Sequence, residues 1–557
     1  MNSIDIWKDR YQYGNESTIE DTFQRVFDAL KHIIIPEKHS LCEEVLMNRY
    51  FIPGGRVLSS IGTTGKNEVG LNCFVLRVDD NLESIGEMQK RARVIFSMGG
   101  GVGFRFFIRP KGFIINRPKG NAAGVNTYID EYNNTVLGTT QGGFRRGAAI
   151  GILDIDHPEV LKFAEAKTYD EDRWKGFNIS VAINREFIRS YIDDKDINLQ
   201  FENVKTEKIN ARELLYQLSE NAWKCGDPGL FHEVNCNRFS TIPDPIISVN
   251  PCGEVPLPHY GICCLGSIVL PKFLIVNKHG SAEEHYTFDH VKFRESVRAG
   301  VHILNAVLDV TEYPYSEIRE KALSQRRIGI GITGLGTTLN LLLMTYGKSS
   351  ALRFTENLLS DMRNIAYEES IKLAKDTRKA PCLENTITYD YFRHSRFIQT
   401  LPKELREGVV KYGAKNIALL SIAPTGTISL LVNDDFPGHI STGIEPIFQK
   451  KFIRKDSFGD HQIETWDYKV LGECASTTLD ITPDQHIDMM EVSQKYIDNS
   501  ISKTVNLPRC SRVEDIYNIY QRVVESEYLK GISVFRNGSK GGVLEIDDSL
   551  DCEICNL

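Results

Sequence analysis

The sequence predicts an α/β fold, and two observations support that prediction. From about residue 70 onward, short apolar runs typical of buried strands alternate with longer amphipathic stretches typical of helices. The runs at 73–76, 179–183 and 417–420 are strand candidates, and residues 211–224 form a clear helix candidate. The chain of 557 residues has no internal repeat or long low-complexity linker, which favours one large domain with appendages.

A helical region is expected ahead of that domain. Residues 18–31 carry a helical pattern with a polar face, opened by the capping-type sequence Ser17-Thr18-Ile19-Glu20. The first seven residues contain no basic segment followed by an apolar run, so neither secretion nor organelle import is indicated and a cytoplasmic location is expected. Most of the twelve cysteines are then expected to be reduced, which points to redox chemistry, metal binding or buried small side chains.

The uncharged run at 328–347 is a poor membrane span, because it contains five glycines, four threonines and an asparagine. It predicts instead a buried strand at 327–332, a glycine-rich turn and a helix at 339–344. The formal net charge of −8 argues against a broad nucleic-acid-binding surface. Local basic pairs, Arg145-Arg146 and Arg326-Arg327, leave small anions as candidate ligands.

Two glycine-rich segments are candidates for backbone contacts. Residues 99–103 read Gly-Gly-Gly-Val-Gly, but no third glycine stands at the spacing that a dinucleotide-binding fingerprint requires, and its acidic ribose-binding residue is not evident. Close approach of a loop or a substrate to the backbone is therefore the better interpretation. Residues 423–429, Ala-Pro-Thr-Gly-Thr-Ile-Ser, follow an apolar run and offer hydroxyls and successive N–H groups. A helix beginning there would bind phosphate, and a plain strand-to-helix turn is the alternative.

A central segment concentrates groups that can do chemistry. Asn250-Pro251-Cys252-Gly253-Glu254 places an amide, a thiol and a carboxylate at every second residue, and in an extended loop all three would point the same way. Cys263 follows eleven residues after Cys252 and is adjacent to Cys264. A thiol with a polar partner on either side favours catalysis over a structural role.

The end of the chain carries a second dithiol candidate. Cys552 and Cys555 form a C-x-x-C pair in an acidic stretch that can hardly build a core. A mobile dithiol there would exchange disulfides first at a buried site and then at the surface. Half of a zinc site is the alternative, but no second C-x-x-C or H-x-x-x-H lies nearby.

With these motifs the sequence resembles a ribonucleotide reductase catalytic subunit, and it is most similar to the adenosylcobalamin-dependent class II enzymes. The resemblance covers most of the chain. The matching segments are residues 71–75, 99–103, 145–148, 156–159, 177–181, 226–231, 250–254, 326–329, 423–429, 502–506 and the terminal C-x-x-C.

The resemblance implies a fold and a division of the chain. A ten-stranded α/β barrel is expected at 66–538, with a finger loop around 250–254 that passes through it. A helical region at 1–65 would precede the barrel, and a flexible redox-active tail at 539–557 would follow it. The barrel topology comes from the resemblance, whereas periodicity alone supports only an α/β fold.

The resemblance also implies the reaction, reduction of ribonucleotides to the 2′-deoxyribonucleotides that supply DNA synthesis. A thiyl radical on Cys252 would take the ribose 3′ hydrogen, Glu254 would accept the 3′-hydroxyl proton, and Asn250 would hold the substrate hydroxyls. Cys73 and Cys263 would form the dithiol that supplies two electrons as the 2′-hydroxyl leaves. Cys552 and Cys555 would then reduce the resulting disulfide with electrons from thioredoxin or glutaredoxin.

The remaining implied contacts complete the expected site. Cys264 stands where relatives more usually carry Asn, and it would compete for pairing with Cys73. The other six cysteines are expected to be structural: Cys42, Cys225, Cys236, Cys382, Cys474 and Cys510. The expected substrate contacts are Asn72, Cys73, Gly101, Asn250, Pro251, Cys252, Gly253, Glu254, Pro424, Thr425, Gly426, Thr427 and Ile428.

The expected source of the radical follows from one segment. Class I subunits carry a Tyr-Tyr relay where residues 531–536 here read Gly-Ile-Ser-Val-Phe-Arg, so adenosylcobalamin is the implied cofactor and no protein-bound metal site is expected. Deoxynucleoside triphosphate effectors are expected, but no ATP-cone module is recognisable at the N-terminus. The protein is expected to be either a dimer or a monomer. A class I-type subunit that needs a radical-generating partner, and a regulatory nucleotide-binding protein without catalysis, are the alternatives.

Overall fold

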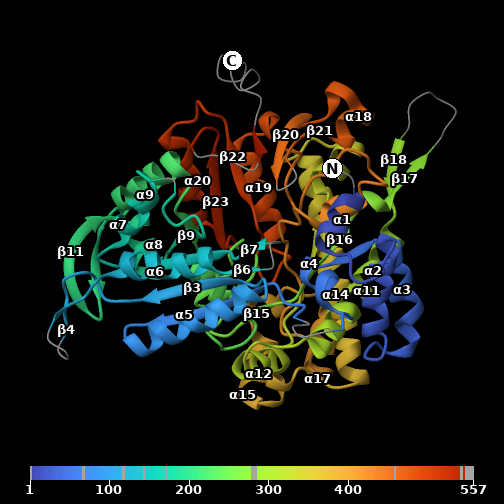
Figure 1. Ribbon diagram of the computed structural model, residues 1–557, viewed down its shortest axis with the longest axis horizontal. Coiled ribbons are helices and arrows are strands. Elements are labelled where there is room, and N and C mark those ends of the chain that lie inside the picture. The colour runs from blue at the N-terminus through green and yellow to red at the C-terminus, as the bar shows by residue number, and fades with distance from the viewer. Residues whose placement is uncertain are drawn as a thin grey trace.

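The computed structural model describes residues 3–64, 69–115, 120–141, 145–170, 172–277, 285–456, 459–539 and 544–545. Strands and helices alternate through most of this length, which confirms the predicted α/β class (Figure 1). The predicted strand at 179–183 is β9 (Phe177–Ala182), and the predicted helix at 211–224 is α9 (Ala211–Cys225). Asn210 caps α9 by accepting from the N–H groups of its first turn, and the left-handed Gly226 ends it.

Helices predominate in the first sixty residues. Thr18 caps the second of them in a capping box that Asp21 completes, one residue later than the sequence pattern placed the acid. Trp7 is buried and donates from Nε1 to Thr22 at 2.7 Å, which joins the first two helices. The helices are α1 (Ser3–Arg10), α2 (Ile19–Leu30), α3 (His39–Met47) and α4 (Gly55–Ser60).

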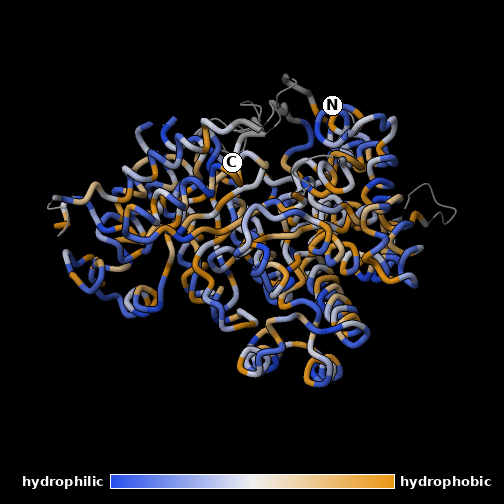
Figure 2. Tube along the Cα trace, turned by 60° about the horizontal axis from the view of Figure 1, so that its bottom comes forward, coloured by the Kyte–Doolittle hydropathy of each residue, from blue (hydrophilic) through white to orange (hydrophobic). Residues whose placement is uncertain are grey.

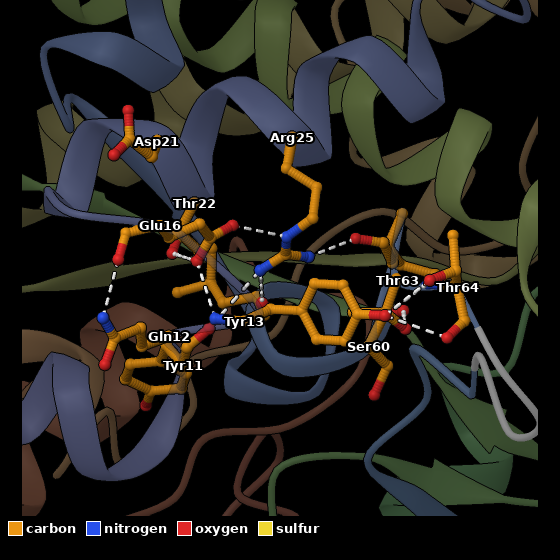
Figure 3. A network of polar contacts seen from close by, with 12 residues as sticks. Tyr11, Gln12, Tyr13, Glu16, Asp21, Thr22, Arg25, Ser60, Thr63 and Thr64 are labelled. Carbon is orange, nitrogen blue, oxygen red and sulfur yellow. Dashed lines mark hydrogen bonds and ion pairs between the residues drawn. The ribbon is translucent and has the colours of Figure 1, made fainter.

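A polar network centred on Arg25 ties α2 to the end of α4 (Figure 3). The guanidinium pairs with Glu16 at 2.7 Å and donates to the carbonyl oxygen of Leu58 at 2.8 Å. The Tyr13 hydroxyl reaches the Thr64 carbonyl oxygen at 2.9 Å. Because Arg25 and Glu16 are largely shielded from solvent, this pair is screened less than a surface ion pair.

In the described part of the chain, the larger sheet has eight strands in the order β15-β2-β3-β8-β9-β12-β23-β22. The strands from β2 to β12 are parallel, whereas β15 meets β2 and β23 meets β12 in antiparallel pairs. The strands not yet bounded are β15 (Ile262–Cys263), β2 (Cys73–Asp79), β3 (Gly101–Phe107), β8 (Ala149–Asp154), β12 (Gly229–Phe231), β23 (Gly531–Arg536) and β22 (Thr504–Leu507).

A smaller sheet continues from β15 after the single residue Cys264. It contains β1 (Phe51–Pro53), β16 (Leu265–Val269) and β19 (Gly329–Thr333), and β16 runs parallel to β19. Two isolated parallel bridges, Ile330 to Leu420 and Ile422 to Ile501, carry the pairing from β19 toward β22. The predicted strand at 417–420 is therefore extended chain held by single bridges.

In Figure 1, α5, α6 and α9 lie on the side of the larger sheet, and α11 and α14 lie on the side of the smaller sheet, where α11 contacts β1, β16 and β19. Hydrophobic residues run through the interior of the chain trace and hydrophilic residues gather toward its rim (Figure 2). β8 and β19 are buried along almost their whole length, as expected for strands covered on both faces. The helices are α5 (Leu82–Ser97), α6 (Val125–Gly138), α11 (His290–Val310) and α14 (Ser349–Asp376).

The uncharged run at 328–347 forms β19 and then α13 (Leu335–Leu341), which confirms a strand followed by a helix. The helix begins earlier than predicted, because Gly336 lies within it. A Cβ at Gly336 would come within 2.7 Å of the Pro446 backbone, so this glycine serves close packing and not a turn. Among the described residues, no helix has the length and apolar character needed to cross a membrane.

Candidate active site

The finger loop is a short hairpin whose strands are β13 (Ser248–Val249) and β14 (Pro256–Leu257). At its tip the Gly253 N–H donates to the Asn250 carbonyl oxygen at 2.9 Å, and Gly253 has a φ of +88°. The tip is thus a tight turn, and the expectation of an extended loop with three side chains pointing alike is wrong, because alternation requires extended backbone. Asn250 and Glu254 are buried, whereas Cys252 is exposed.

Glycines of β3 make room for this hairpin. A Cβ at Gly103 would lie 1.9 Å from the Val249 carbonyl oxygen, and one at Gly101 would lie 3.0 Å from the Pro251 ring. Real side chains do not tolerate a contact as short as the first, so the hairpin and β3 can approach only where Cβ is absent. The predicted close approach at residues 99–103 is confirmed, and its partner is the finger loop.

The Asn250 amide joins two groups predicted to be catalytic. Its Oδ1 accepts from the Val255 N–H at 2.9 Å, which fixes the side chain, and its Nδ2 donates to Cys73 Sγ at 3.4 Å. The same side chain hydrogen-bonds the Glu254 carboxyl. One amide therefore lies between the carboxyl group and the thiol.

The Glu254 carboxyl is held in an unusual state. It is 3% exposed, and burial raises its pKa to about 7 against the opposing effect of the Asn250 hydrogen bond. Its Oε2 has no hydrogen-bond partner among the described residues. The Glu254 carbonyl oxygen accepts from the Ser500 N–H and the Ser421 hydroxyl, so the backbone is anchored while the carboxyl remains able to exchange a proton.

Cys73 and Cys263 face each other across β2 and β15, as a directly opposed antiparallel pair. Opposed residues in such a ladder lie within the Cα separation that a disulfide spans. Burial raises the pKa of Cys263 well above its usual value, and a hydrogen bond with the Cys73 thiol raises it further. Cys263 is 1% exposed and Cys73 is 9% exposed, so this is a nearly enclosed dithiol.

Cys264 faces a different environment. Its thiol donates to the Leu304 carbonyl oxygen on α11 at 3.7 Å, and it packs in the main hydrophobic core, whereas Cys263 packs with Cys73 in a separate small cluster. Burial raises the Cys264 pKa to about 12, which disfavours its thiolate. The expected competition of Cys264 for Cys73 is therefore not supported by the geometry.

Residues 424–427 lead into a five-residue 3₁₀ helix, η5 (Ile428–Val432), and not into an α-helix. Thr425 has a φ of +56°, which is rare for a β-branched residue, and its hydroxyl accepts from the Gly443 N–H and contacts the Thr333 hydroxyl, both at 2.8 Å. Within the described part of the chain, the N–H groups of Gly426 and Thr427 donate to no protein acceptor.

Two further polar atoms, one at a predicted substrate contact and one beside the predicted turn, are buried without a partner in the described structure. These are Asn72 Oδ1, one residue before Cys73, and the Ser429 hydroxyl, just after the turn. Buried polar atoms are normally satisfied, so such atoms indicate where a polar ligand completes the site. Ser429 was not among the predicted contacts, although it ends the motif that suggested the turn.

A cavity of about 650 Å³ opens beside the finger tip. Pro251, Cys252 and Gly253 form part of its wall, together with Pro424 and Ser429 of the turn region. Asn250, Glu254, Cys73 and Cys263 do not line this cavity. Cys252 therefore borders the open cavity, whereas the dithiol and the Glu254 carboxyl form no part of its wall.

Sequence reasoning missed several contacts and placed others outside the described structure. Ser421 and Ser500, which hold the Glu254 backbone, carried no local signal because they come from distant segments. The pair Arg326-Arg327 is no anion cluster, since both side chains are buried and Arg326 pairs with Asp309 at 2.7 Å. Cys552 and Cys555 lie outside the described residues, as do the side chains of Arg145 and Arg146.

Comparison with known proteins gives consistent matches over most of the chain. The family model described as the ribonucleotide reductase barrel domain matches residues 71–473 and 469–534. A vitamin B12-dependent ribonucleoside-diphosphate reductase of Mycobacterium tuberculosis is 31% identical over 539 residues, covering 89% of this chain and 72% of the relative.

Two more distant comparisons agree. The protein of the same name from Thermoplasma acidophilum is 30% identical over 566 residues, covering 94% of this chain and 69% of the relative. The ribonucleoside-diphosphate reductase large chain 2 of Saccharomyces cerevisiae is 25% identical over 458 residues, covering 74% of this chain and 51% of the relative. The strongest of these similarities are thus to proteins named for vitamin B12 dependence.

Proposed function

The chain belongs to the ribonucleotide reductase family, and on that premise we propose that it reduces ribonucleotides to 2′-deoxyribonucleotides with adenosylcobalamin as cofactor. The observation that carries the proposal is the dithiol of Cys73 and Cys263, which the Asn250 amide joins to the Glu254 carboxyl, together with an exposed Cys252 in the same hairpin. The names of the relatives support the choice of cofactor.

The proposed fold is a ten-stranded barrel at 66–538. Its support is the order of strand pairing, which runs from β15 and β16 through β2 to β12, then through β23 and β22 to the segments at Ile422 and Leu420 and back to β19. β19 pairs with β16, which would close the ring. The helical segment at 1–65 and the tail at 539–557 are the proposed additions to it.

In the proposed chemistry the dithiol is the two-electron donor. The Cys252 thiyl radical takes the ribose 3′ hydrogen atom, and the C2′–O bond then breaks. The 2′-hydroxyl leaves as water with one hydrogen from the dithiol, and the other hydrogen of the dithiol goes to C2′. Cys73 and Cys263 lose two electrons in total and form one disulfide, and Cys252 returns the hydrogen atom to C3′. The direct opposition of Cys73 and Cys263 supports this pairing.

Glu254 and Asn250 would manage the proton and the hydroxyls. A carboxyl with a pKa of about 7 is half ionised at neutral pH, so Glu254 can accept the 3′-hydroxyl proton and later release it. The unpartnered Oε2 of Glu254 supports a substrate hydroxyl as its natural partner. The Asn250 amide hydrogens contact the Cys73 thiol and the Glu254 carboxyl, and a substrate hydroxyl would take one of these contacts while Oδ1 stays bound to Val255.

The cavity beside Cys252 would admit the adenosyl group of the cofactor. Its volume of about 650 Å³ lies in the range of nucleotide-sized pockets, and its walls combine apolar groups such as Ile150, Phe231 and Phe448 with polar ones such as Ser180. When bound, adenosylcobalamin supplies homolysis of its cobalt–carbon bond as the source of the one-electron oxidation of Cys252. Ile150, Phe231 and Phe448 would exclude water from that space.

The turn at Pro424 to Ile428 would bind the substrate phosphates. The unused N–H groups of Gly426 and Thr427 and the unpartnered Ser429 hydroxyl are its support. Asn72, Cys73 and Gly101 would line the nucleoside part of the substrate. We further expect thioredoxin or glutaredoxin to be the external reductant and deoxynucleoside triphosphates to be the effectors. The protein would act as a dimer or as a monomer.

The test is ribonucleotide reduction by the purified chain with dithiothreitol and effectors, with and without adenosylcobalamin. Product formed only with the cofactor is the expected result. Product formed only after a second, radical-generating subunit is added would replace the cofactor assignment with a class I-type mechanism. Effector binding without turnover in every condition would favour a regulatory protein that has lost catalysis.

A further inference from the structure

Asn178 lies in β9 and faces the cavity that Cys252 lines, and the proposed function gives it no role. Its side chain is exposed to that cavity, and its Nδ2 donates to the Pro251 carbonyl oxygen at 3.1 Å. That carbonyl belongs to the peptide unit that joins Pro251 to Cys252. Any shift of the peptide unit therefore moves the Cys252 thiol.

The finger tip needs such a support. Gly253 has a φ of +88°, and nothing lies within 4 Å of the position a Cβ would occupy there, so side-chain packing does not restrain this end of the turn. On the other side, the Pro251 ring rests against Gly101 of β3. Two strands thus hold Pro251, with β3 contacting its ring and β9 holding its carbonyl oxygen.

The position of Asn178 is itself fixed from both sides. Lys167 Nζ donates to the carbonyl oxygen of Phe177 at 2.7 Å, and the N–H of Ile179 lies 3.5 Å from Asp227 Oδ1. Lys167 and Asp227 form an ion pair of 2.7 Å, with side chains only 10% and 7% exposed. A shielded pair of opposite charges therefore closes a ring around the backbone that carries Asn178.

We propose that Asn178 is a positioning residue for Cys252, and that the Lys167–Asp227 ion pair holds the strand end from which Asn178 acts. This inference rests on the proposed function, because it assigns a reacting role to Cys252. It also gives a purpose to residues 177–181 and 226–231, two motif segments for which the resemblance named no catalytic group. The bond fixes the sulfur without touching the substrate.

The test compares Asn178→Ala and the isosteric Asn178→Asp with the parent. Both variants lack the donor, so kcat is expected to fall about 10- to 100-fold while KM for the ribonucleotide stays within about twofold. A second readout needs neither cofactor nor substrate. Hydrogen exchange of the peptide spanning 248–257 in the resting protein is expected to speed up in both variants.

Asn126→Ala is the matched control. Asn126 lies in α6, and its Nδ2 also donates to a backbone carbonyl oxygen, that of Lys162, at 3.1 Å. It is expected to leave both readouts unchanged. Parent-like kcat in the two Asn178 variants, or a loss of turnover in Asn126→Ala equal to theirs, would overturn the proposal. If the parent protein reduces no ribonucleotide, the proposed function fails. Unchanged hydrogen exchange at 248–257 in the Asn178 variants would separately refute the positioning role of Asn178.

Discussion

At the residue scale, the Glu254 carboxyl combines a functional advantage with a cost in stability. A buried carboxyl has few groups to stabilise its charge, and here burial outweighs the Asn250 hydrogen bond, so its pKa reaches about 7. Between the ordinary carboxyl pKa of 4.5 and about 7, the folded chain keeps a proton that the unfolded chain has lost. The stability contributed by this group therefore falls as pH rises through that window.

Glu254→Gln tests both consequences. Turnover by the parent is expected to rise with pH through about 7 and then level off, because only the ionised carboxylate accepts a proton. The variant is expected to lose about 10²- to 10⁴-fold in kcat and to lose that pH limb. Its melting temperature at pH 8 is expected to exceed that of the parent by about 1–3 °C, with a smaller gain at pH 5.

A pH profile that keeps its limb near 7 in Glu254→Gln would assign the titration to another group. A variant less stable than the parent at pH 8 would contradict the burial argument, because removal of a charge from a buried position relieves its desolvation cost. The two readouts are independent, since melting requires neither cofactor nor substrate.

The dithiol makes a second prediction at this scale. Prereduced protein given substrate without an external reductant is expected to end with one Cys73–Cys263 disulfide, identified by peptide mass spectrometry. The opposed positions in β2 and β15 favour this pair, and the bond of Cys264 to Leu304 turns that thiol toward α11. Cys264→Ala is the control and is expected to form the same disulfide and the same amount of product.

A disulfide that contains Cys264 would contradict the pairing. Cys263→Ala is expected to abolish reduction while leaving Cys73 open to alkylation, because the remaining thiol has no partner with which to release two electrons. Full turnover in Cys263→Ala would remove the pair from the mechanism.

At the element scale, β3 and the finger hairpin are matched by their missing side chains. Gly103→Ala would place a Cβ 1.9 Å from the Val249 carbonyl oxygen, so the hairpin must move away from β3. We expect a loss of about 1–3 kcal/mol in stability and a loss of about 100-fold in kcat, measured by thermal melting and by steady-state reduction.

Gly86→Ala in α5 is the matched control for that change. Nothing lies within 4 Å of a Cβ at Gly86, and alanine favours a helix interior over glycine by about 0.5–1 kcal/mol. It is expected to stabilise the protein slightly and to leave turnover unchanged. Parent-like activity in Gly103→Ala would show that the hairpin has room to shift without displacing Cys252.

Local signals predicted the elements better than the contacts between them. The strands at Cys73 and Phe177 and the helix α9 follow from runs of apolar residues and caps that a single segment contains. The early start of α13 could not be predicted in this way, because a glycine such as Gly336 is typical of a turn. Only the structure shows that Gly336 is needed for close packing against the Pro446 backbone. The tip of the finger loop likewise depends on Gly253, whose positive φ no alternating pattern reveals.

At the scale of the whole molecule, the sheet order depends on pairs that lie far apart in the sequence. Leu230 pairs with Ile532, and the carbonyl oxygen of Glu254 is held from Ser421 and Ser500. Periodicity carries no information on such pairs, so composition and pattern predicted an α/β class and no topology. The site residues were identified through motif resemblance, which carries long-range proximity that the local pattern lacks.

The last prediction concerns electron supply to the enclosed dithiol. Cys263 is 1% exposed, so a folded protein reductant has little access to its sulfur, and a tethered carrier solves that problem. Cys552→Ser with Cys555→Ser is expected to leave about one product per prereduced chain and to stop cycling supported by thioredoxin, while dithiothreitol still sustains turnover. Cys474→Ser with Cys510→Ser, which removes two other exposed thiols, is the control and should cycle normally. Thioredoxin-supported cycling at the parent rate without Cys552 and Cys555 would mean that electrons reach Cys73 directly, since Cys73 is the more exposed member of the pair.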